Sequence, residues 1–301
     1  MRSLVAIGLP ETGKTTFLAA LWHVTEREEV PGSLRLAKIS ENAKHLNSIK
    51  NDWLSFKRVV RTVPGQEQSA TLWLREESGV IGEVVFPDLS GESFQGGWEE
   101  RHWTKEYNQL IADAGSLLLF IHPGTLREPY TIAEMQKMAE AAFPEENENN
   151  DAVTENVEEE DKQAPEAAEE WDPEKTPTQV QLVELLQFAD HCIKADRPVR
   201  IAVIISAWDL VKNDYPGDAG PKKWLEDRTS YLDQYLKSNF EQFKVRVYGV
   251  SAQGGDLKAD RELLLSFEHA SDRILIEGPD CSPHDISEPI RWCLGLRDGT
   301  D

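Results

Sequence analysis

One short segment near the N-terminus constrains the fold more than any other. Residues 8–15 read Gly-Leu-Pro-Glu-Thr-Gly-Lys-Thr and match the pattern Gly-x-x-x-x-Gly-Lys-[Ser/Thr]. A short apolar run, residues 3–7, precedes the match, and apolar residues at helical spacing follow it from residue 15 to residue 28. By residue frequencies the pattern arises by chance in about one such chain in a hundred. Between a strand and a helix it predicts a loop that holds nucleotide phosphates.

Each residue type in this loop has a physical role. Gly8 and Gly13 allow the backbone to bend until successive N–H groups point into one concavity. Lys14 brings a cation to the β- and γ-phosphate oxygens, and the Thr15 hydroxyl is a ligand for Mg²⁺. We therefore predict nucleotide contacts from the whole loop and the first turn of the helix: Gly8, Pro10, Glu11, Thr12, Gly13, Lys14, Thr15 and Thr16.

Apolar runs alternate with helical stripes along most of the chain. We expect strands at residues 3–7, 70–75, 82–87, 116–121, 199–205, 245–250 and 273–277, and helices at residues 15–28, 41–56, 221–236 and 286–296 together with stripes near residues 103–111 and 182–193. This alternation predicts an α/β fold with a mostly parallel sheet and helices on both faces. With the phosphate loop between its first strand and first helix, such a fold is similar to the three-layer P-loop NTPase fold.

A second motif follows the strand expected at residues 82–87. Asp88-Leu-Ser-Gly91 has an acidic residue placed to hold Mg²⁺ through water, and Gly91 can offer its N–H to a γ-phosphate. Asp-x-x-Gly is also a common turn, and its position downstream of the phosphate loop favours the functional interpretation. We expect the neighbouring residues Gln95, Gly96 and Gly97 to be flexible and to suit an order–disorder switch.

A third group of residues points to the base. Asp209 follows a buried strand, and its carboxylate can accept hydrogen bonds from the N1–H and N2–H₂ groups of guanine, which adenine lacks. Ser251 and Ala252 end the next strand, where backbone N–H groups can contact guanine O6. A strand-end Asp is often only a turn or a helix cap, but the order of the motifs is more specific than any single one.

Together these motifs resemble the translation-factor-related class of P-loop GTPases. More narrowly, the segments at residues 8–21, 88–92, 206–209 and 289–292 resemble the bacterial double-GTPase group. The resemblance implies a GTPase that acts beside a second GTPase in bacterial conflict or antiphage systems.

Several positions depart from the family pattern. Ser206 and Ala207 stand where the family has Asn and Lys, so no aliphatic stem lies over the base and guanine selectivity rests on Asp209. Glu92 stands where Ras-like proteins have Gln; a carboxylate can orient the attacking water but repels the γ-phosphate. Pro10 removes one amide donor from the loop. We therefore expect slow hydrolysis or hydrolysis that depends on a partner.

The resemblance also implies a switch threonine between the first helix and the second strand. We assign it to Thr62, with Thr71 as the alternative, so Thr15, Asp88 and Thr62 are the predicted Mg²⁺ contacts and Lys14, Glu92 and Thr62 the predicted catalytic residues. Arg58 and Arg61 are either arginine fingers in cis or solvated surface charges.

Charge and cysteine content exclude several other classes of protein. The 301 residues carry a formal charge of −22, which argues against a nucleic-acid binder or a protein docked on an anionic membrane. Residues 144–177 hold 14 acidic and two basic residues, and we read them as a disordered acidic insertion, or alternatively as a docking segment for a basic partner. Three widely spaced cysteines predict free thiols in a reducing cytoplasm.

The domain plan is thus a single GTPase domain over residues 1–301, with that insertion and an extra segment at residues 254–283. We expect GTP and Mg²⁺ as ligands and hydrolysis to GDP and phosphate as a conformational switch. A nucleotide-dependent scaffold without significant turnover and an ATP-using phosphotransferase are the alternatives. The expected partners are proteins encoded nearby, a second GTPase or an activator among them.

Overall fold

The computed structural model describes residues 2–38, 42–57, 69–87, 92–130, 133, 135–137, 176–196 and 198–296. Its strands are β1 Arg2–Ile7, β2 Arg35–Lys38, β3 Ala70–Arg75, β4 Ile81–Phe86, β5 Ser116–Ile121, β6 Val199–Ser206, β7 Phe243–Ser251 and β8 Leu275–Glu277. Its helices are α1 Lys14–Arg27, α2 Ala43–Leu54, α3 Glu92–Glu99, α4 Lys105–Ala112, α6 Thr178–Cys192, α7 Gly220–Arg228, α8 Ser230–Ser238, α9 Arg261–Ser266 and α10 Glu288–Cys293, with 3-10 turns at Pro123–Thr125, Trp208–Leu210 and Ala270–Arg273.

The strands form one sheet in the order β2-β3-β4-β1-β5-β6-β7-β8. Pairings from β4 through β1, β5 and β6 to β7 are parallel, and β2, β3 and β8 join through antiparallel pairings at the two edges. The mostly parallel sheet predicted from the sequence is therefore confirmed. None of the helices in the described part of the chain is long and apolar enough to cross a bilayer.

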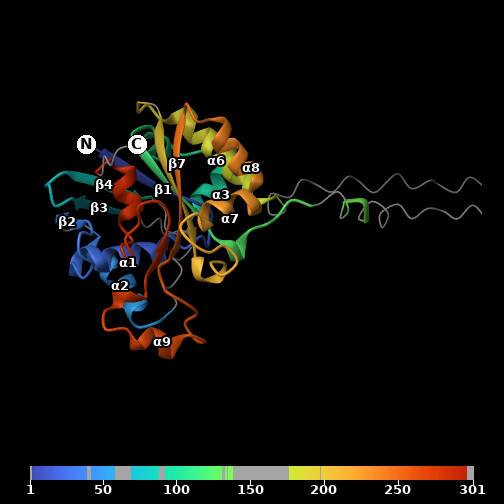
Figure 1. Cartoon of the computed structure of the whole chain (residues 1–301). Coiled ribbons are helices and arrows are strands. Elements are labelled where there is room, and N and C mark those ends of the chain that lie inside the picture. The colour runs from blue at the N-terminus through green and yellow to red at the C-terminus, as the bar shows by residue number, and fades with distance from the viewer. Residues whose placement is uncertain are drawn as a thin grey trace, which may run out of the picture.

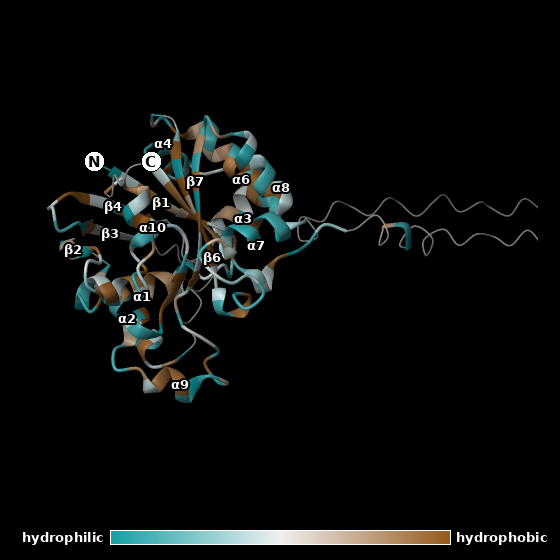
Figure 2. Ribbon diagram, in the orientation of Figure 1, coloured by the Kyte–Doolittle hydropathy of each residue, from teal (hydrophilic) through white to brown (hydrophobic). Residues whose placement is uncertain are grey.

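Two hydrophobic cores lie on opposite faces of the sheet. Side chains alternate along β1, so Leu4 and Ala6 join one core while Val5 and Ile7 join the other. The first core includes buried residues of α1, α2 and α10; the second includes those of α3, α4, α6, α7 and α8. Figure 1 shows α1 and α2 on one side of the strands and α6 and α8 on the other. Figure 2 shows hydrophobic colour along the central strands and mixed colour on the covering helices. This is the predicted three-layer arrangement.

The C-terminal helix is fastened to the sheet by a buried charged group. Arg291 of α10 is 2% exposed, and its guanidinium lies 3.0 Å from Glu76, 2.7 Å from Glu288 and 3.4 Å from Asp285. It also donates to the carbonyl of Gly32, between α1 and β2. Since Glu76 follows β3, Arg291 connects α10 to the hairpin of β3 and β4.

One local prediction was wrong. The helix expected at residues 221–236 is two helices, because Thr229 adopts φ of −136° and ψ of 52°, outside the helical region. The amide of Tyr231, just after this break, donates to the side chain of Gln179 of α6 (2.9 Å). Residues 95–97, expected to be a flexible switch, lie within α3, and the switch itself stays a prediction.

Packing explains the order of α3. Phe94 is 1% exposed and Trp98 8% exposed. A Cβ on Gly97 would come within 2.7 Å of the Trp103 ring, so the glycine lets the ring pack against the helix. Phe94, the third residue of α3, is thus buried in the core, and residues 95–97 follow it in the same helix.

The acidic insertion lies outside the described residues apart from Thr176 and Pro177. The extra segment at residues 254–283 contains α9, a 3-10 turn and β8, which pairs antiparallel with β7 at the edge of the sheet. The additional strand expected in that segment is present, and it spans Leu275–Glu277.

Candidate functional site

The loop between β1 and α1 is held against two neighbouring strands. A Cβ on Gly8 would come within 3.0 Å of both Cβ and the carbonyl oxygen of Phe120, at the end of β5. Gly13 has φ of 85°, in the left-handed region, and a Cβ there would lie 3.0 Å from Cβ of Ser206, at the end of β6. Both glycines thus lie in close contact with a neighbouring strand, and both have a positive φ (155° for Gly8) that residues with a side chain rarely adopt.

Lys14 reaches back over this loop. The residue is 2% exposed, and Nζ donates to the carbonyls of Gly8 (2.9 Å) and Leu9 (2.8 Å) and lies 3.4 Å from Oγ1 of Thr12. A buried ammonium group needs such oxygen partners to offset its lost hydration. The contacts hold the cation inside the loop, at the N-terminus of α1, where the helix dipole also favours an anion.

The first turn of α1 brings two threonines to the cavity. Thr15 and Thr16 follow Lys14, both are half-buried, and both line the cavity described below. A hard oxygen donor beside a phosphate-binding loop fits Mg²⁺, which takes one or two protein ligands together with phosphate oxygens. The second predicted protein contact, Asp88, lies outside the described residues.

The predicted base-reading residues meet at the ends of β6 and β7. Ala207 adopts φ of 46° and turns the chain into the 3-10 turn that carries Asp209. The Ser251 hydroxyl donates to Oδ1 of Asp209 and accepts from the amide of Gly254 at 3.0 Å. Trp208 is fully buried, and its Nε1 donates to Glu277 of β8 at 2.7 Å, which connects the turn to the edge strand.

Ser206 links the two halves of the site. Ser206 is 7% exposed, and its hydroxyl donates to the carbonyl of Ile121 at 3.2 Å. Because Ser206 also lies against Gly13, the end of β6 supports the phosphate loop directly.

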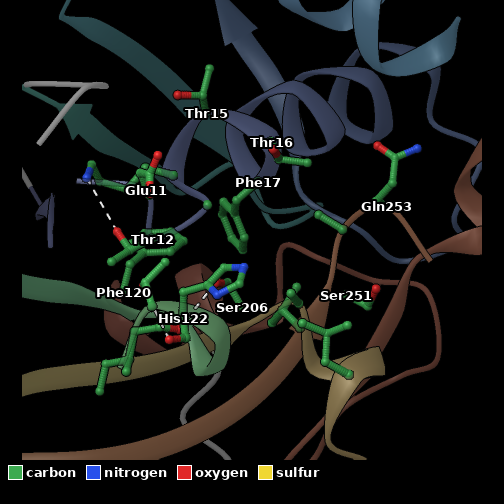
Figure 3. Close-up of a pocket in the computed structure, with 18 of the residues that line it drawn as sticks. Glu11, Thr12, Thr15, Thr16, Phe17, Phe120, His122, Ser206, Ser251 and Gln253 are labelled. Atoms are coloured by element: carbon green, nitrogen blue, oxygen red, sulfur yellow. Dashed lines mark hydrogen bonds between the residues drawn. The ribbon is translucent and has the colours of Figure 1, made fainter. Parts of the chain in front are cut away.

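One cavity of about 910 Å³ joins the two ends. In the view of Figure 3, Glu11 and Thr12 lie on one side, Ser251 and Gln253 on the other, and Phe17, His122 and Ser206 between them. The predicted site residues that line it are Pro10, Glu11, Thr12, Gly13, Lys14, Thr15, Thr16, Asp209, Ser251 and Ala252. Gly8 contributes through its carbonyl bond to Lys14.

Other predicted site residues are not placed. Thr62, Asp88 and Gly91 lie outside the described residues, as do Arg58 and Arg61. Glu92 begins α3, but the structure describes nothing of its side chain. Thr71, the alternative switch threonine, lies inside β3 opposite Val85 of β4.

The structure also brings side chains to the cavity that the sequence did not single out as site residues. They include Lys57, after α2, Gln95 of α3, His122 and Arg127, after β5, and Gln253 and Lys258, after β7. A usable signal existed for His122, which directly follows an apolar strand at the carboxyl edge of a parallel sheet. The others come from loops and helix ends, where sequence spacing gives no such indication.

His122 is held as a neutral acceptor. Burial lowers the pKa of His122, and the Asp209 carboxylate opposes that shift. Nδ1 accepts from the amide of Gly124 at 2.9 Å, so in the neutral ring the proton is on Nε2. The imidazole is therefore uncharged at neutral pH.

Three solved structures resemble the chain at low sequence identity. The nucleolar GTP-binding protein 1 of Plasmodium falciparum is 9% identical, with a TM-score of 0.36 over 87% of this chain and 83% of that chain. The S. cerevisiae Ski7 GTPase-like domain bound to GTP is 13% identical, with a TM-score of 0.38 over 84% of this chain and 43% of that chain. The signal recognition particle receptor SRb-GTP/SRX complex of Chaetomium thermophilum is 10% identical, with a TM-score of 0.38 over 84% and 91%. No curated protein sequence matches the chain at a significant level.

A family comparison covers nearly the whole chain. The model of the family described as double-GTPase 1 matches residues 5–293, a range that runs from β1 to α10 and contains the phosphate loop, Asp209 and Ser251. The chain therefore belongs to the double-GTPase 1 family.

Proposed function

We propose that the protein binds GTP in the cavity between α1 and the ends of β6 and β7, and hydrolyses it to GDP and phosphate. The observation that carries this proposal is that Lys14 and the paired Asp209 and Ser251 line the same cavity of about 910 Å³. A cavity of that size is in the range of small-molecule sites. Membership of a GTPase family supports the same conclusion.

The chain's own groups do three things to the bound nucleotide. Amides of the loop before α1, and the N-terminus of that helix, hold the β-phosphate. Lys14 moves from its carbonyl partners to the phosphate oxygens and neutralises charge that develops in the transition state. Asp209 accepts from the guanine edge, oriented by the Ser251 hydroxyl.

We further propose that hydrolysis depends on Mg²⁺, held by Thr15 and Asp88 with Thr62, and that it serves as a conformational switch. When bound, Mg²⁺ supplies positive charge to the β- and γ-phosphate oxygens. Thr15 supports this proposal because its side chain lines the cavity next to Lys14. Glu92 would orient the attacking water, and its negative charge beside the γ-phosphate predicts slow turnover by the isolated protein.

The test is Lys14→Ala. Without the ammonium group, affinity for GTP should fall about 100-fold or more, since charge-assisted bonds to the phosphates are lost. Lys223→Ala is the control, because Lys223 is exposed, does not line the cavity and pairs with Asp227, four positions on in the same helix. GTP affinity and phosphate release would be measured for both variants, with and without EDTA. Equal GTP affinity and equal phosphate release in Lys14→Ala and wild type would refute the phosphate site. GTP binding by the wild type without phosphate release would favour the scaffold alternative.

We also propose that the partner is a second GTPase or an activating protein encoded nearby, and that the pair acts in the cytoplasm in bacterial conflict or antiphage defence. The family's description as a double GTPase supports the second GTPase, and the three free thiols suit a reducing compartment. Phosphate release measured with each neighbouring gene product, followed by phage challenge of cells carrying Lys14→Ala, tests both parts. Stimulation by none of them and unchanged resistance would refute this proposal.

A further inference from the structure

The loop that follows β7 is anchored from a distant part of the chain. Residues 251–254 contain the predicted base contacts, and the Ser251 hydroxyl closes the loop by accepting from the amide of Gly254. The indole Nε1 of Trp53, near the end of α2, donates to the carbonyl of Ala252 at 3.0 Å. Trp53 is 0% exposed and is not among the residues that line the cavity, whereas Ala252 and Gln253 are.

A second side chain clamps Trp53 and the loop together. The Arg273 guanidinium lies 3.8 Å from the centroid of the Trp53 ring, and Nη2 donates to the Trp53 carbonyl at 2.8 Å. Arg273 also lies 4.5 Å from the ring of Phe56. The backbone carbonyl of Arg273 packs against the loop, since a Cβ on Gly254 would come within 2.3 Å of that oxygen. Burial lowers the pKa of Arg273 to about 10, which agrees with its enclosure by aromatic rings.

The hydrogen bond from Trp53 to the Ala252 carbonyl also orients the N–H group of the next residue, Gln253. The carbonyl of Ala252 and the amide of Gln253 belong to one planar trans peptide, so their C=O and N–H bonds point in opposite directions. Fixing that carbonyl on buried Trp53 turns the Gln253 N–H away from the core. Guanine presents two donors to Asp209 and one acceptor, O6, beside them, and O6 requires a donor of this kind.

We propose that Trp53 is a positioning residue for the guanine base: its indole N–H sets the peptide between Ala252 and Gln253 so that the amide faces O6. This inference rests on the proposed function, because it assumes that guanine lies beside Asp209. It makes the preference for a 6-oxo purine depend on a residue in α2 that touches neither nucleotide nor metal.

A matched tryptophan separates this role from simple packing. Trp22 of α1 is also buried, at 2% exposure, and its Nε1 donates to Oδ1 of Asn47 of α2 at 3.1 Å. A buried indole N–H needs an acceptor in either case. The two residues therefore share burial, ring and one hydrogen bond, and differ in that only the acceptor of Trp53 belongs to the predicted base loop.

The experiment compares Trp53→Phe with Trp22→Phe in the full chain. Dissociation constants for GTP and for 6-thioguanosine triphosphate, which keeps both donors to Asp209 and has sulfur, a weak acceptor, in place of O6, would be measured by competition with a fluorescent GTP analogue. Trp53→Phe should weaken GTP about fivefold to tenfold, the loss expected for one hydrogen bond, and weaken the 6-thio nucleotide much less. Trp22→Phe should leave the ratio of the two constants at the wild-type value.

The result that overturns the inference is an unchanged ratio in Trp53→Phe while Asp209→Asn abolishes GTP preference; the proposed function then stands. Equal weakening of both nucleotides by Trp53→Phe also overturns it, since that is the signature of general destabilisation. If Trp53→Phe does not fold, Arg273→Met serves in its place. It removes the hydrogen bond to the Trp53 carbonyl and keeps most of the aliphatic side chain. GTP should again be weakened more than the second nucleotide. Wild-type protein that does not bind GTP refutes the proposed function itself.

Discussion

Replacing Asp209 by Asn should invert the base preference of the protein. The Ser251 hydroxyl has one proton, which it directs at Oδ1 of Asp209, and it accepts from the amide of Gly254. In Asp209→Asn the amide oxygen keeps the Ser251 proton, because the opposite orientation would leave that proton without an acceptor. The new NH₂ group is therefore presented to the base.

The size of the effect follows from the bonds that are lost. In the proposed binding mode guanine gives two hydrogen bonds to the Asp209 carboxylate, and bonds to charged groups contribute about 1.5 to 3 kcal/mol each. In Asp209→Asn the amide oxygen can still accept from N1–H, but the bond to the 2-amino group is replaced by two donors that face each other. The remaining bond no longer involves a charged group, so GTP should bind about 100-fold more weakly. Xanthine carries an oxygen where guanine carries its 2-amino group, so the same NH₂ becomes a matching donor and xanthosine triphosphate should bind more tightly to the variant than to wild type.

The assay is competition by GTP, xanthosine triphosphate and ATP. The competitors displace a fluorescent GTP analogue from the wild type and a fluorescent xanthosine triphosphate analogue from the variant. Ser251→Ala is the useful companion, since it frees the side chain at position 209 to turn; combined with Asp209→Asn, it should blunt the inversion. If Asp209→Asn binds GTP as tightly as wild type and gains nothing for xanthosine triphosphate, Asp209 does not read the base and the assignment of that end of the cavity is wrong.

Three further predictions concern stability and pH. Gly13→Ala forces a side chain into φ of 85° and to within 3.0 Å of Ser206, so it should cost about 1 to 3 kcal/mol and lower Tm by about 2 to 10 °C; an unchanged Tm would contradict the strain argument. Burial lowers the pKa of His122, so its contribution to stability is complete above the unfolded value of 6.5 and is lost as pH falls through the folded value. His122→Gln should therefore make the loss of stability in acid less steep, as measured by thermal unfolding across pH; an unchanged slope in this variant would contradict the prediction. Arg291→Met leaves two buried carboxylates without their cation and should destabilise the protein by about 3 to 5 kcal/mol, measured by urea unfolding; a cost under about 1 kcal/mol would mean that these carboxylates are not held as the structure has them.

The sequence predicted the buried centre of the fold better than its edges. Strand β5 is buried at every position and reads as a continuous apolar run, which is the pattern of a central parallel strand. Strand β2, with the sequence Arg-Leu-Ala-Lys, is half-buried and antiparallel at the edge, and has no such run. The break between α7 and α8 accompanies a hydrogen bond to Gln179 of α6, a contact between segments far apart in the chain.

The site divides in the same way. The loop from Gly8 to Lys14 could be predicted because its residues are contiguous and one local conformation requires them. The order of Asp209 and Ser251 indicated two neighbouring strand ends, but not the hydrogen bond between them. The lining by Lys57 could not be predicted, because it depends on where α2 packs against the loop after β7.

The departures from the family pattern have a common structural consequence. Ser206 lies so close to Gly13 that there is little room at the end of β6, and its short hydroxyl still joins β6 to β5 through the carbonyl of Ile121. Ala207 takes a left-handed conformation, which is uncommon without glycine, and its methyl group has no stem to lay over a base. In the proposed binding mode a base therefore lacks the contact that a Lys at position 207 would make with its face, while Asp209 and the loop after β7 contact its edge. Hydrogen bonds to the edge weaken steeply with angle, so the affinity of the protein for guanine should depend on how rigidly Asp209 and that loop are held.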